Sequence, residues 1–370
     1  MKVIGIIAEY NPFHNGHLYH INKIKELYKD SIIILVLNGY FLERGEVSII
    51  SKRDKVNIAL LNNIDIVLEL PFVYGTQSAD IFANASITYL EDLGCDYVVF
   101  GSESNNLEKL TEIAQYSISE NELYKEKIKE LLNTGLNYPT ALAKALNIDF
   151  DFLPNDLLGI SYIKSILSNN YNIKPITIKR TNDYHDTTSK NEIVSASNIR
   201  YKLKNNENIE NYIPKIVSKY IHNIDLNDFF KNIKYKIITE HDLSIYLDVD
   251  EGIENRLKKV INECSTTDEL IEKVKSKRYT YNKIRRMLVH ILVGFTKEDN
   301  KNLKHEYIKI LGFNEIGKKY LNKRKKETNT SFIVNKDSLV YKYELTAGAL
   351  YDLVTNSNSL EYETKNKPIK

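Results

Sequence analysis

Short apolar runs alternate with amphipathic segments over the first two hundred residues of the chain. The apolar runs are Val3–Ile7, Ile32–Leu37, Ile66–Glu69, Tyr97–Phe100 and Ile173–Ile178. The amphipathic segments between them are Gly16–Tyr28, Lys52–Leu61, Ala79–Leu93 and Leu107–Leu132. Apolar runs of this length are typical of buried strands, and the longer segments have the period of helices. The alternation predicts an α/β fold, with a Rossmann-like, doubly wound and mainly parallel sheet.

The pattern changes after Arg200, where polar helical segments replace the strand-like runs. These segments are Ile253–Ile261, Thr267–Lys275, Tyr281–Phe295 and Asn302–Leu311. They predict a mostly α-helical second domain. The Asn- and Glu-rich stretch Asn205–Asn211 is the expected linker, so we expect one domain over residues 1–203 and another over 204–370. The polar last ten residues are expected to be frayed.

Polar segments follow four of the predicted strands. They are Tyr10–His17, Asn38–Glu46, Pro71–Asp80 and Gly101–Glu103. Ligands of doubly wound sheets bind beyond the carboxyl ends of the strands. We therefore expect these four segments to converge on one site.

Two histidines, His14 and His17, stand three positions apart where the first strand gives way to a helix. Residues at this spacing share one helix face, and a helix N-terminus already favours an anion. Gly16 lets a nucleotide approach the backbone closely, and Pro12 is tolerated at a helix entry. The pair therefore indicates a polyphosphate site, although one histidine could instead cap the helix while the other packs.

A second constellation, Ser195–Arg200, follows the fifth predicted strand. Ser195 and Ser197 offer hydroxyls on alternate residues, and Arg200 follows about one turn later. Together they could cap a helix while donating hydrogen bonds to phosphates. An ordinary N-cap followed by a solvated arginine is the alternative.

Composition narrows the class of protein. The 51 basic and 49 acidic residues leave a net charge of +2, so nucleic-acid binding requires local clusters. No apolar run reaches about 18 residues and no signal-type start is present, so we expect a cytoplasmic protein without a membrane span. Cys95 and Cys264 lie far apart, which argues against a zinc site.

Basic residues interleaved with tyrosines form two clusters in the second half of the chain. The first is Lys273, Lys275, Lys277, Arg278, Lys283, Arg285 and Arg286, around Tyr279 and Tyr281; the second is Lys318, Lys319, Lys323, Arg324, Lys325 and Lys326, around Tyr320. Such clusters suit phosphate contact and base stacking, and thus RNA. A solvated helix face is the alternative for each.

The ordered series of motifs resembles the bacterial tRNA(Met) cytidine acetate ligase family, within the nucleotidyltransferases that carry a HIGH signature. The segments that carry the resemblance are Gly5–His17, Phe41–Glu46, Glu69–Phe72, Gln77–Asp80, Phe100–Glu103, Pro154–Ile160, Ile178–Arg180, Tyr184–Asp186 and Ser276–Thr280. The resemblance implies a ligase that uses ATP and acetate to form acetyl-adenylate. It further implies that the acetyl group is transferred to N4 of the wobble cytidine of elongator tRNA(Met).

The resemblance also implies which residues contact ATP. They are Gly101, Asn155, Arg180 and the loop Ile7, Ala8, Glu9, Tyr10, Asn11, Pro12, Phe13, His14, Asn15, Gly16, His17, Leu18, Tyr19 and His20. To these we add Ser195 and Ser197. We expect His14, His17 and Arg200 to be catalytic. Candidate tRNA contacts are Arg44, Lys277, Arg278, Arg285, Lys325 and Lys326. Mg²⁺ is expected to arrive with ATP, but no residue pattern identifies a metal ligand or an oligomeric state.

The chemistry of the two expected steps differs. Acetate is already ionised at pH 7, so its attack on the α-phosphate needs charge stabilisation without a base. The cytidine amine, in contrast, must lose a proton, and Glu9, Glu43, Asp80 and His185 are all candidate bases. A small-molecule adenylyltransferase that acts on a phosphorylated cofactor precursor is the alternative function. A non-catalytic RNA-binding protein is a third, which the intact His14, Gly16, His17 and Arg200 disfavour.

Overall fold

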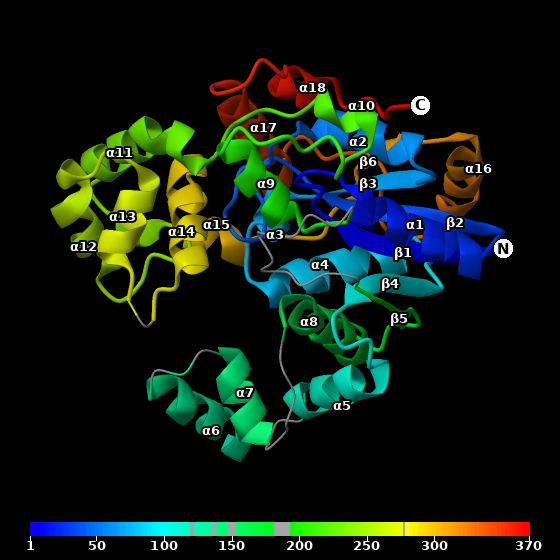
Figure 1. Ribbon diagram of the computed structural model, residues 1–370, viewed down its shortest axis with the longest axis horizontal. Coiled ribbons are helices and arrows are strands. Elements are labelled where there is room, and N and C mark those ends of the chain that lie inside the picture. Colours follow the sequence, from blue (N-terminus) through cyan, green and yellow to red (C-terminus); the bar gives the residue numbers. More distant parts are fainter. Residues whose placement is uncertain (119–121, 135, 137, 147–152, 181–192, 277) are drawn as a thin grey trace.

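A six-stranded sheet forms the centre of the protein (Figure 1). The computed structural model describes residues 1–118, 122–134, 136, 138–146, 153–180, 193–276 and 278–370. The strands are β1 (Lys2–Ala8), β2 (Ser31–Asn38), β3 (Ile66–Leu70), β4 (Tyr97–Ser102), β5 (Lys174–Lys179) and β6 (Ile310–Phe313). Their order is β5-β4-β1-β2-β3-β6, with β6 antiparallel to β3 and the other pairs parallel. The predicted α/β fold and its five predicted strands are confirmed.

Helices cover both faces of the sheet because its central strands are apolar on both sides. Along β2, Ile32, Ile34 and Val36 pack in one core with helices α4 (Ala79–Asp92), α5 (Leu107–Ile118) and α8 (Pro154–Ser168). The alternate residues of β2 pack in a second core with α1 (Asn15–Leu27), α2 (Lys52–Leu61) and α9 (Ala196–Lys204). Buried parallel strands have this two-sided apolar character.

Further helices follow the same chain order. Before residue 204 they are α3 (Phe72–Gly75), α6 (Glu122–Asn133) and α7 (Tyr138–Leu146). After it they are α10 (Lys215–Ser218), α11 (Phe230–Thr239), α12 (Ile253–Val260), α13 (Thr267–Val274), α14 (Tyr281–Val293), α15 (Lys297–Lys301), α16 (Glu315–Arg324), α17 (Leu339–Asp352) and α18 (Ser359–Lys365), with short 3-10 helices at Leu226–Phe229, Leu243–Ile245 and Ile261–Glu263. The single helical pattern predicted for 107–132 falls on two helices, α5 and α6.

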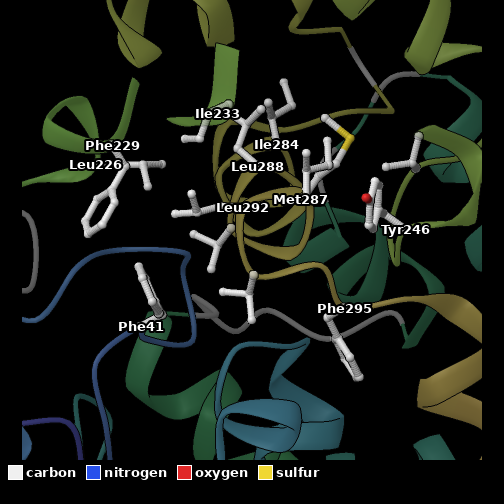
Figure 2. Packing of buried hydrophobic residues seen from close by; sticks show 14 of the residues in the cluster. Phe41, Leu226, Phe229, Ile233, Tyr246, Ile284, Met287, Leu288, Leu292 and Phe295 are labelled. Carbon is white, nitrogen blue, oxygen red and sulfur yellow. The ribbon is translucent and has the colours of Figure 1, made fainter. Parts of the chain in front are cut away.

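A third apolar core holds α11 to α14 together and joins them to α3 and to the loop that follows β2. Figure 2 shows Ile284, Leu288 and Leu292 of α14 within this core. Phe41, which follows β2, also belongs to it, and its ring lies 5.6 Å from that of Phe229 between centroids. The helical region is therefore packed against the loop that follows β2.

The helix predicted over Asn302–Leu311 is wrong. Residues 310–313 form β6, in which Phe313 pairs with Ile66 and Gly312 with Val67. The C-terminal tail continues this arrangement, since the N–H of Ile369 donates to Leu311 O at 2.9 Å. The expectation of frayed last residues is therefore also wrong. Both differences have one physical reason, which is that the backbone groups of an open sheet edge need partners. β6 pairs with the edge of β3, and the tail pairs with β6.

A buried cluster of charges fastens the C-terminal helices to the sheet. Lys52 of α2 lies 2.6 Å from Glu69 of β3, 2.6 Å from Glu344 of α17 and 2.7 Å from Glu363 of α18. Lys309 also contacts Glu69, at 3.0 Å. Burial raises the pKa of Glu344 to about 7, which relieves the excess of carboxylates over ammonium groups. Buried charges persist only when paired in this way.

Residues after 204 therefore contribute both to the helical region and to the edge of the sheet. The division between residues 203 and 204 stays a prediction. Across the described residues, no helix has the length and apolar character that a membrane span requires.

Candidate active site

A cavity of about 270 Å³ opens beyond the carboxyl ends of β1, β4 and β5. It lies where the strand order reverses between β1 and β4, which is the usual ligand position in a doubly wound sheet. Most of the residues expected to bind ATP line it. These are Ile7, Ala8, Glu9, Tyr10, Asn11, His14, Gly16, His17, Tyr19, His20, Gly101, Asn155, Arg180, Ser195 and Ser197, together with Arg200.

His14 and His17 form a reciprocal cap at the start of α1. Nδ1 of His14 accepts a hydrogen bond from the N–H of Gly16 at 3.0 Å, and Nδ1 of His17 accepts one from the N–H of His14 at 3.2 Å. The two rings are stacked, with centroids 3.8 Å apart. Because both Nδ1 atoms are acceptors, each neutral ring carries its proton on Nε2. The capping and phosphate-binding interpretations are thus compatible, since capping directs one N–H donor of each ring away from the helix end.

The cavity histidines are neutral. Burial, with the Arg180 and Arg200 guanidinium groups nearby, lowers the pKa of His14 to about 3. Burial likewise lowers the pKa of His17 well below its ordinary value and that of His20 to about 4. Nε2 of His20 is buried without a hydrogen-bond partner in the described part of the chain. Buried polar atoms normally have a hydrogen-bond partner, and a bound ligand can supply the missing one here.

Gly16 and Tyr10 set the shape of the histidine loop. A Cβ atom at Gly16 would lie 2.7 Å from Cε1 of His14, so glycine is required by the histidine ring itself. Tyr10 has a φ of 47°, a left-handed conformation that is unfavourable for a bulky side chain. Its ring packs edge-on against His17 at 4.7 Å between centroids. Strain of this kind is often found at functional sites.

The second constellation lies at the N-terminus of α9. Oγ of Ser195 accepts from the N–H of Asn198 at 3.1 Å, which makes Ser195 the N-cap of the helix. Arg200 donates from Nη1 to Asn11 O at 2.7 Å. The start of α9 is thereby tied to the loop that holds the histidines. Ser195, Ser197 and Arg200 therefore line the same cavity as His14 and His17.

The loop 41–47 contributes acidic residues that bridge the cavity and α14. Glu46 accepts from Nη2 of Arg200 at 2.7 Å and from Nη1 of Arg285 at 3.2 Å. Although burial opposes it, these two arginines lower the pKa of Glu46. Gly45 has a φ of 69°, and a Cβ there would lie 2.5 Å from the backbone of Arg285. The loop is therefore fitted closely against α14.

Glu9 and Glu43 complete the acidic side of the cavity. Oε1 of Glu9 accepts from Nδ2 of Asn38 at 2.9 Å and from the N–H of Glu43 at 2.8 Å. Burial raises the pKa of Glu9, and it raises that of Glu43 to about 7. Lys55 donates to Glu9 O at 2.9 Å, and burial lowers the pKa of its ammonium group to about 7.

Gly101, Arg180 and Asn155 lie on the opposite side, at the ends of β4 and β5 and the start of α8. A Cβ atom at Gly101 would lie 3.2 Å from Cγ of Arg180, so glycine makes room for the arginine. Asn155 is held by Glu103, which accepts from its side-chain and backbone N–H groups. Asn155 is not the N-cap of α8, because Leu153 occupies that position.

Four of the residues expected to contact ATP do not line the cavity. Phe13 is buried in the core, and Leu18 packs partly against it. Asn15 donates from Nδ2 to Asn211 O at 2.9 Å, and Pro12 lies in the turn before α1. Side chains on a helix point in different directions, so a continuous loop cannot place all its residues in one cavity.

The segment Pro71–Asp80 also does not line the cavity, contrary to expectation. Thr76 donates to Phe41 O at 2.8 Å, and Gln77 donates to Asn300 at 2.9 Å. Asp80 pairs with Ser161 and Lys164. This segment therefore holds the loop after β2 and the helical region in place.

Several lining residues were not assigned from the sequence. Phe82, Phe100, Leu158 and Tyr162 form an apolar wall. These residues have the apolar pattern of ordinary core positions, and only Phe100 and Leu158 lie within the quoted motif segments. Glu46 was also not assigned. It ends the polar segment after β2, and ligands of such sheets bind beyond the strand ends, so its position could have indicated a site residue.

The predicted RNA contacts are divided among three places. Arg44 lines the cavity, and Arg285 is half-buried beside Glu46. Arg278 pairs with Glu251 at 3.0 Å on the helical region. Lys325 and Lys326 are exposed at the end of α16, on the far side of the sheet from α11 to α14 (Figure 1). Lys277 lies outside the described residues.

One group of three acidic side chains in the described residues is close enough to hold a metal ion. It consists of Glu69, Glu344 and Glu363. The ammonium groups of Lys52 and Lys309 already lie among these carboxylates, so this cluster does not fit a metal site. It therefore identifies no ligands for the Mg²⁺ expected with ATP.

Comparison with known proteins agrees with this geometry. The family model described as HIGH Nucleotidyl Transferase matches residues 1–367. A tRNA(Met) cytidine acetate ligase from Caldicellulosiruptor saccharolyticus is 41% identical over 92% of this chain and 89% of its own length, and that of Bacillus subtilis is 34% identical over 95% and 92%. A crystal structure of Thermotoga maritima TmcAL bound with alpha-thio ATP has a TM-score of 0.86 at 28% identity, covering 100% of this chain and 99% of that one. The chain belongs to the HIGH nucleotidyl transferase family and, within it, to the tRNA(Met) cytidine acetate ligases.

Proposed function

We propose that this protein is an ATP-dependent ligase that activates acetate as acetyl-adenylate and acetylates N4 of the wobble cytidine of elongator tRNA(Met). The observation that carries the proposal is the joint placement of two neutral histidines and two arginines around one cavity at the switch point of the sheet. The names of the relatives support the ligase activity and the tRNA substrate.

The adenylation step follows from the donors around the cavity. Acetate attacks the α-phosphate, and negative charge grows on the non-bridging oxygens and on the departing pyrophosphate. The Nε2–H groups of His14 and His17 and the guanidinium groups of Arg180 and Arg200 can stabilise that charge. The helix N-termini of α1 and α9 add a favourable dipole. Donors fixed in this way before the substrate arrives are the main source of such catalysis.

Neutral histidines suit this role better than charged ones in the empty cavity. Two imidazolium rings stacked at 3.8 Å would repel each other and the nearby arginines. Neutral rings keep their Nε2–H donors without that cost. A bound triphosphate would raise the pKa of both histidines, because a nearby negative charge favours the protonated form.

The transfer step needs an RNA surface close to the cavity. Arg285 and Arg286 of the first basic cluster reach the cavity loop through Glu46 and Glu43. We therefore propose that the acceptor cytidine enters from the side of α14. Arg44, at the cavity wall, is a further proposed RNA contact, together with Arg278, Lys325 and Lys326.

The alternative function, a small-molecule adenylyltransferase, has no support among the named relatives, which are acetate ligases. Mg²⁺ is proposed to arrive with ATP and to be held chiefly by the phosphates, as is usual for this ion.

Isotope exchange between pyrophosphate and ATP tests the proposal. We expect exchange that depends on acetate and does not need RNA. His17→Ala should reduce it at least about 100-fold, the usual effect of losing one fixed donor to a developing charge. Lys29→Ala, in the exposed turn between α1 and β2, is the control and should leave the exchange unchanged. Exchange that requires a phosphorylated small molecule, or no exchange at all, would contradict the proposal.

A further inference from the structure

The Glu43 carboxylate lies in the cavity wall at the point where α14 meets the nucleotide site. The proposed transfer step requires a proton acceptor, and four carboxylate or imidazole groups were candidates on sequence grounds. The structure separates them by position. Asp80 is paired with Lys164 at 3.1 Å and is not among the cavity residues, and His185 lies outside the described residues.

Among the cavity carboxylates, the engagement of the oxygens and the position relative to α14 together distinguish Glu43 from Glu9 and Glu46. Oε1 of Glu9 already accepts two N–H bonds, at 2.9 and 2.8 Å. Both oxygens of Glu46 are engaged by arginines, at 2.7 and 3.2 Å. Among the described residues, the cationic partners of Glu43 are Arg286 at 3.5 Å and Arg44 at 3.6 Å. These distances exceed the roughly 2.7–2.9 Å of a strong charge-assisted hydrogen bond.

We infer that Glu43 is the catalytic base that accepts the proton from the cytidine N4 amine during acyl transfer. The inference rests on the proposed function. Its physical basis is the combination of cavity position, loosely engaged oxygens and a place on the α14 side, where the acceptor is proposed to enter.

The step balances without any further reactant. The lone pair of N4 attacks the carbonyl carbon of acetyl-adenylate, and a C–N bond forms. The bond between that carbon and the phosphate oxygen breaks, and AMP leaves with the electron pair. One N4 proton passes to a carboxylate oxygen of Glu43, which later releases it to solvent.

The surroundings of Glu43 also shift its pKa in the direction that suits a base. Burial raises its pKa to about 7, Arg286 of α14 and Arg44 of its own loop oppose the rise, and Glu9 and Glu46 add to it. A base works best when its pKa is near the working pH. The transfer rate should therefore increase with pH up to about 7 and level off above it, as the carboxyl group loses its proton.

The test separates the two steps. Acetate-dependent exchange of pyrophosphate with ATP reports adenylation, and single-turnover acetylation of elongator tRNA(Met) from added acetyl-adenylate reports transfer. A general base contributes about 100- to 10,000-fold, so Glu43→Gln should lower transfer by at least about 100-fold and leave exchange within about threefold. It should also abolish the increase of transfer with pH. The control is Glu26→Gln, which makes the same substitution at an exposed glutamate near the end of α1.

The outcomes are distinguishable. If the wild-type protein neither exchanges nor transfers acetyl groups, the proposed function fails. If the wild type transfers and Glu43→Gln transfers equally fast, or if the folded variant loses exchange as strongly as transfer, the assignment of the base is overturned. Should Glu43→Gln fail to fold, as judged by circular dichroism and thermal unfolding, Glu43→Asp replaces it. Glu43→Asp should keep the pH-dependent rise at a reduced rate, and a flat profile would overturn the assignment.

Discussion

Glu46 holds Arg200 at 2.7 Å, and this ion pair joins the loop after β2 to α9, the helix that carries the Ser195–Arg200 motif. The same carboxylate accepts from Arg285 of α14 at 3.2 Å. One side chain therefore fixes an arginine of the nucleotide site and an arginine of the basic cluster. Through Glu46, the proposed adenylation site and the proposed RNA side contact the same carboxylate.

Loss of the Glu46 charge should impair adenylation. A hydrogen bond to a charged group contributes roughly 1.5–3 kcal/mol, so Glu46→Gln should reduce acetate-dependent exchange by about tenfold or more, mainly in kcat. The KM for ATP should change less, because Arg200 is only one of several proposed phosphate donors. Steady-state exchange kinetics provide the measurement, with Glu26→Gln as the matched control. An unchanged kcat would show that Arg200 needs no support from Glu46.

A methyl group at Gly16 should damage the site and not the fold. Its Cβ would lie 2.7 Å from His14, so the ring must move and its Nε2–H donor with it. Gly16→Ala should weaken ATP binding about tenfold or more, because a hydrogen bond to a charged group contributes roughly 1.5–3 kcal/mol. An alanine that fits within a helix normally stabilises it by about 1 kcal/mol relative to glycine. Calorimetric ATP titration and thermal unfolding measure the two effects; unchanged ATP affinity with higher stability would mean that the ring is not displaced.

Removal of Lys325 and Lys326 should affect RNA binding alone. Both are exposed at the end of α16, away from the cavity (Figure 1). The double change to alanine should leave exchange intact, weaken tRNA binding by about three- to tenfold and reduce its salt dependence, because phosphate contacts release counterions. Filter binding at two salt concentrations is the measurement, with Lys29→Ala as the control. Loss of exchange in the lysine variant would contradict the division of roles between the cavity and α16.

Acid should destabilise the protein through its buried histidines. An unfolded histidine has a pKa of about 6.5, whereas burial lowers the pKa of His20 to about 4 in the folded chain. Below pH 6.5 the unfolded chain therefore binds a proton that the folded chain does not, and stability is lost as the pH falls toward 4. Thermal unfolding of the ligand-free protein should show a lower Tm at pH 5 than at pH 7.5. The decrease should be smaller in His20→Asn, and an equal decrease would assign it to other groups.

Most of the sheet and its helices could be predicted from the sequence. The strands β1 to β5 and the helices α1, α2, α4, α12, α13 and α14 end close to the predicted residues. Their apolar positions repeat at the period of a strand or a helix, and that period is a local property. β6 could not be predicted in the same way, since its residues form a strand only because β3 presents an open edge far away in sequence.

The candidate site was predictable to a similar extent. The two motifs His14–His17 and Ser195–Arg200 indicated phosphate binding by residue type and spacing, and both line one cavity. The acidic side of that cavity was only partly anticipated. Glu43 was one of four candidate bases, and Glu46 was not singled out, because its role depends on arginines from α9 and α14.

The sequence by itself determined the fold class, the histidine loop with its chemistry and the resemblance to an acetate ligase family, because these depend on local periodicity and on short ordered motifs. The tertiary structure decided which residues of that loop face the cavity, that its histidines are neutral, and that Glu46 joins Arg200 to Arg285. The physical reason is that burial, pKa and ion pairing arise from contacts between residues far apart in the chain. No local pattern contains those contacts.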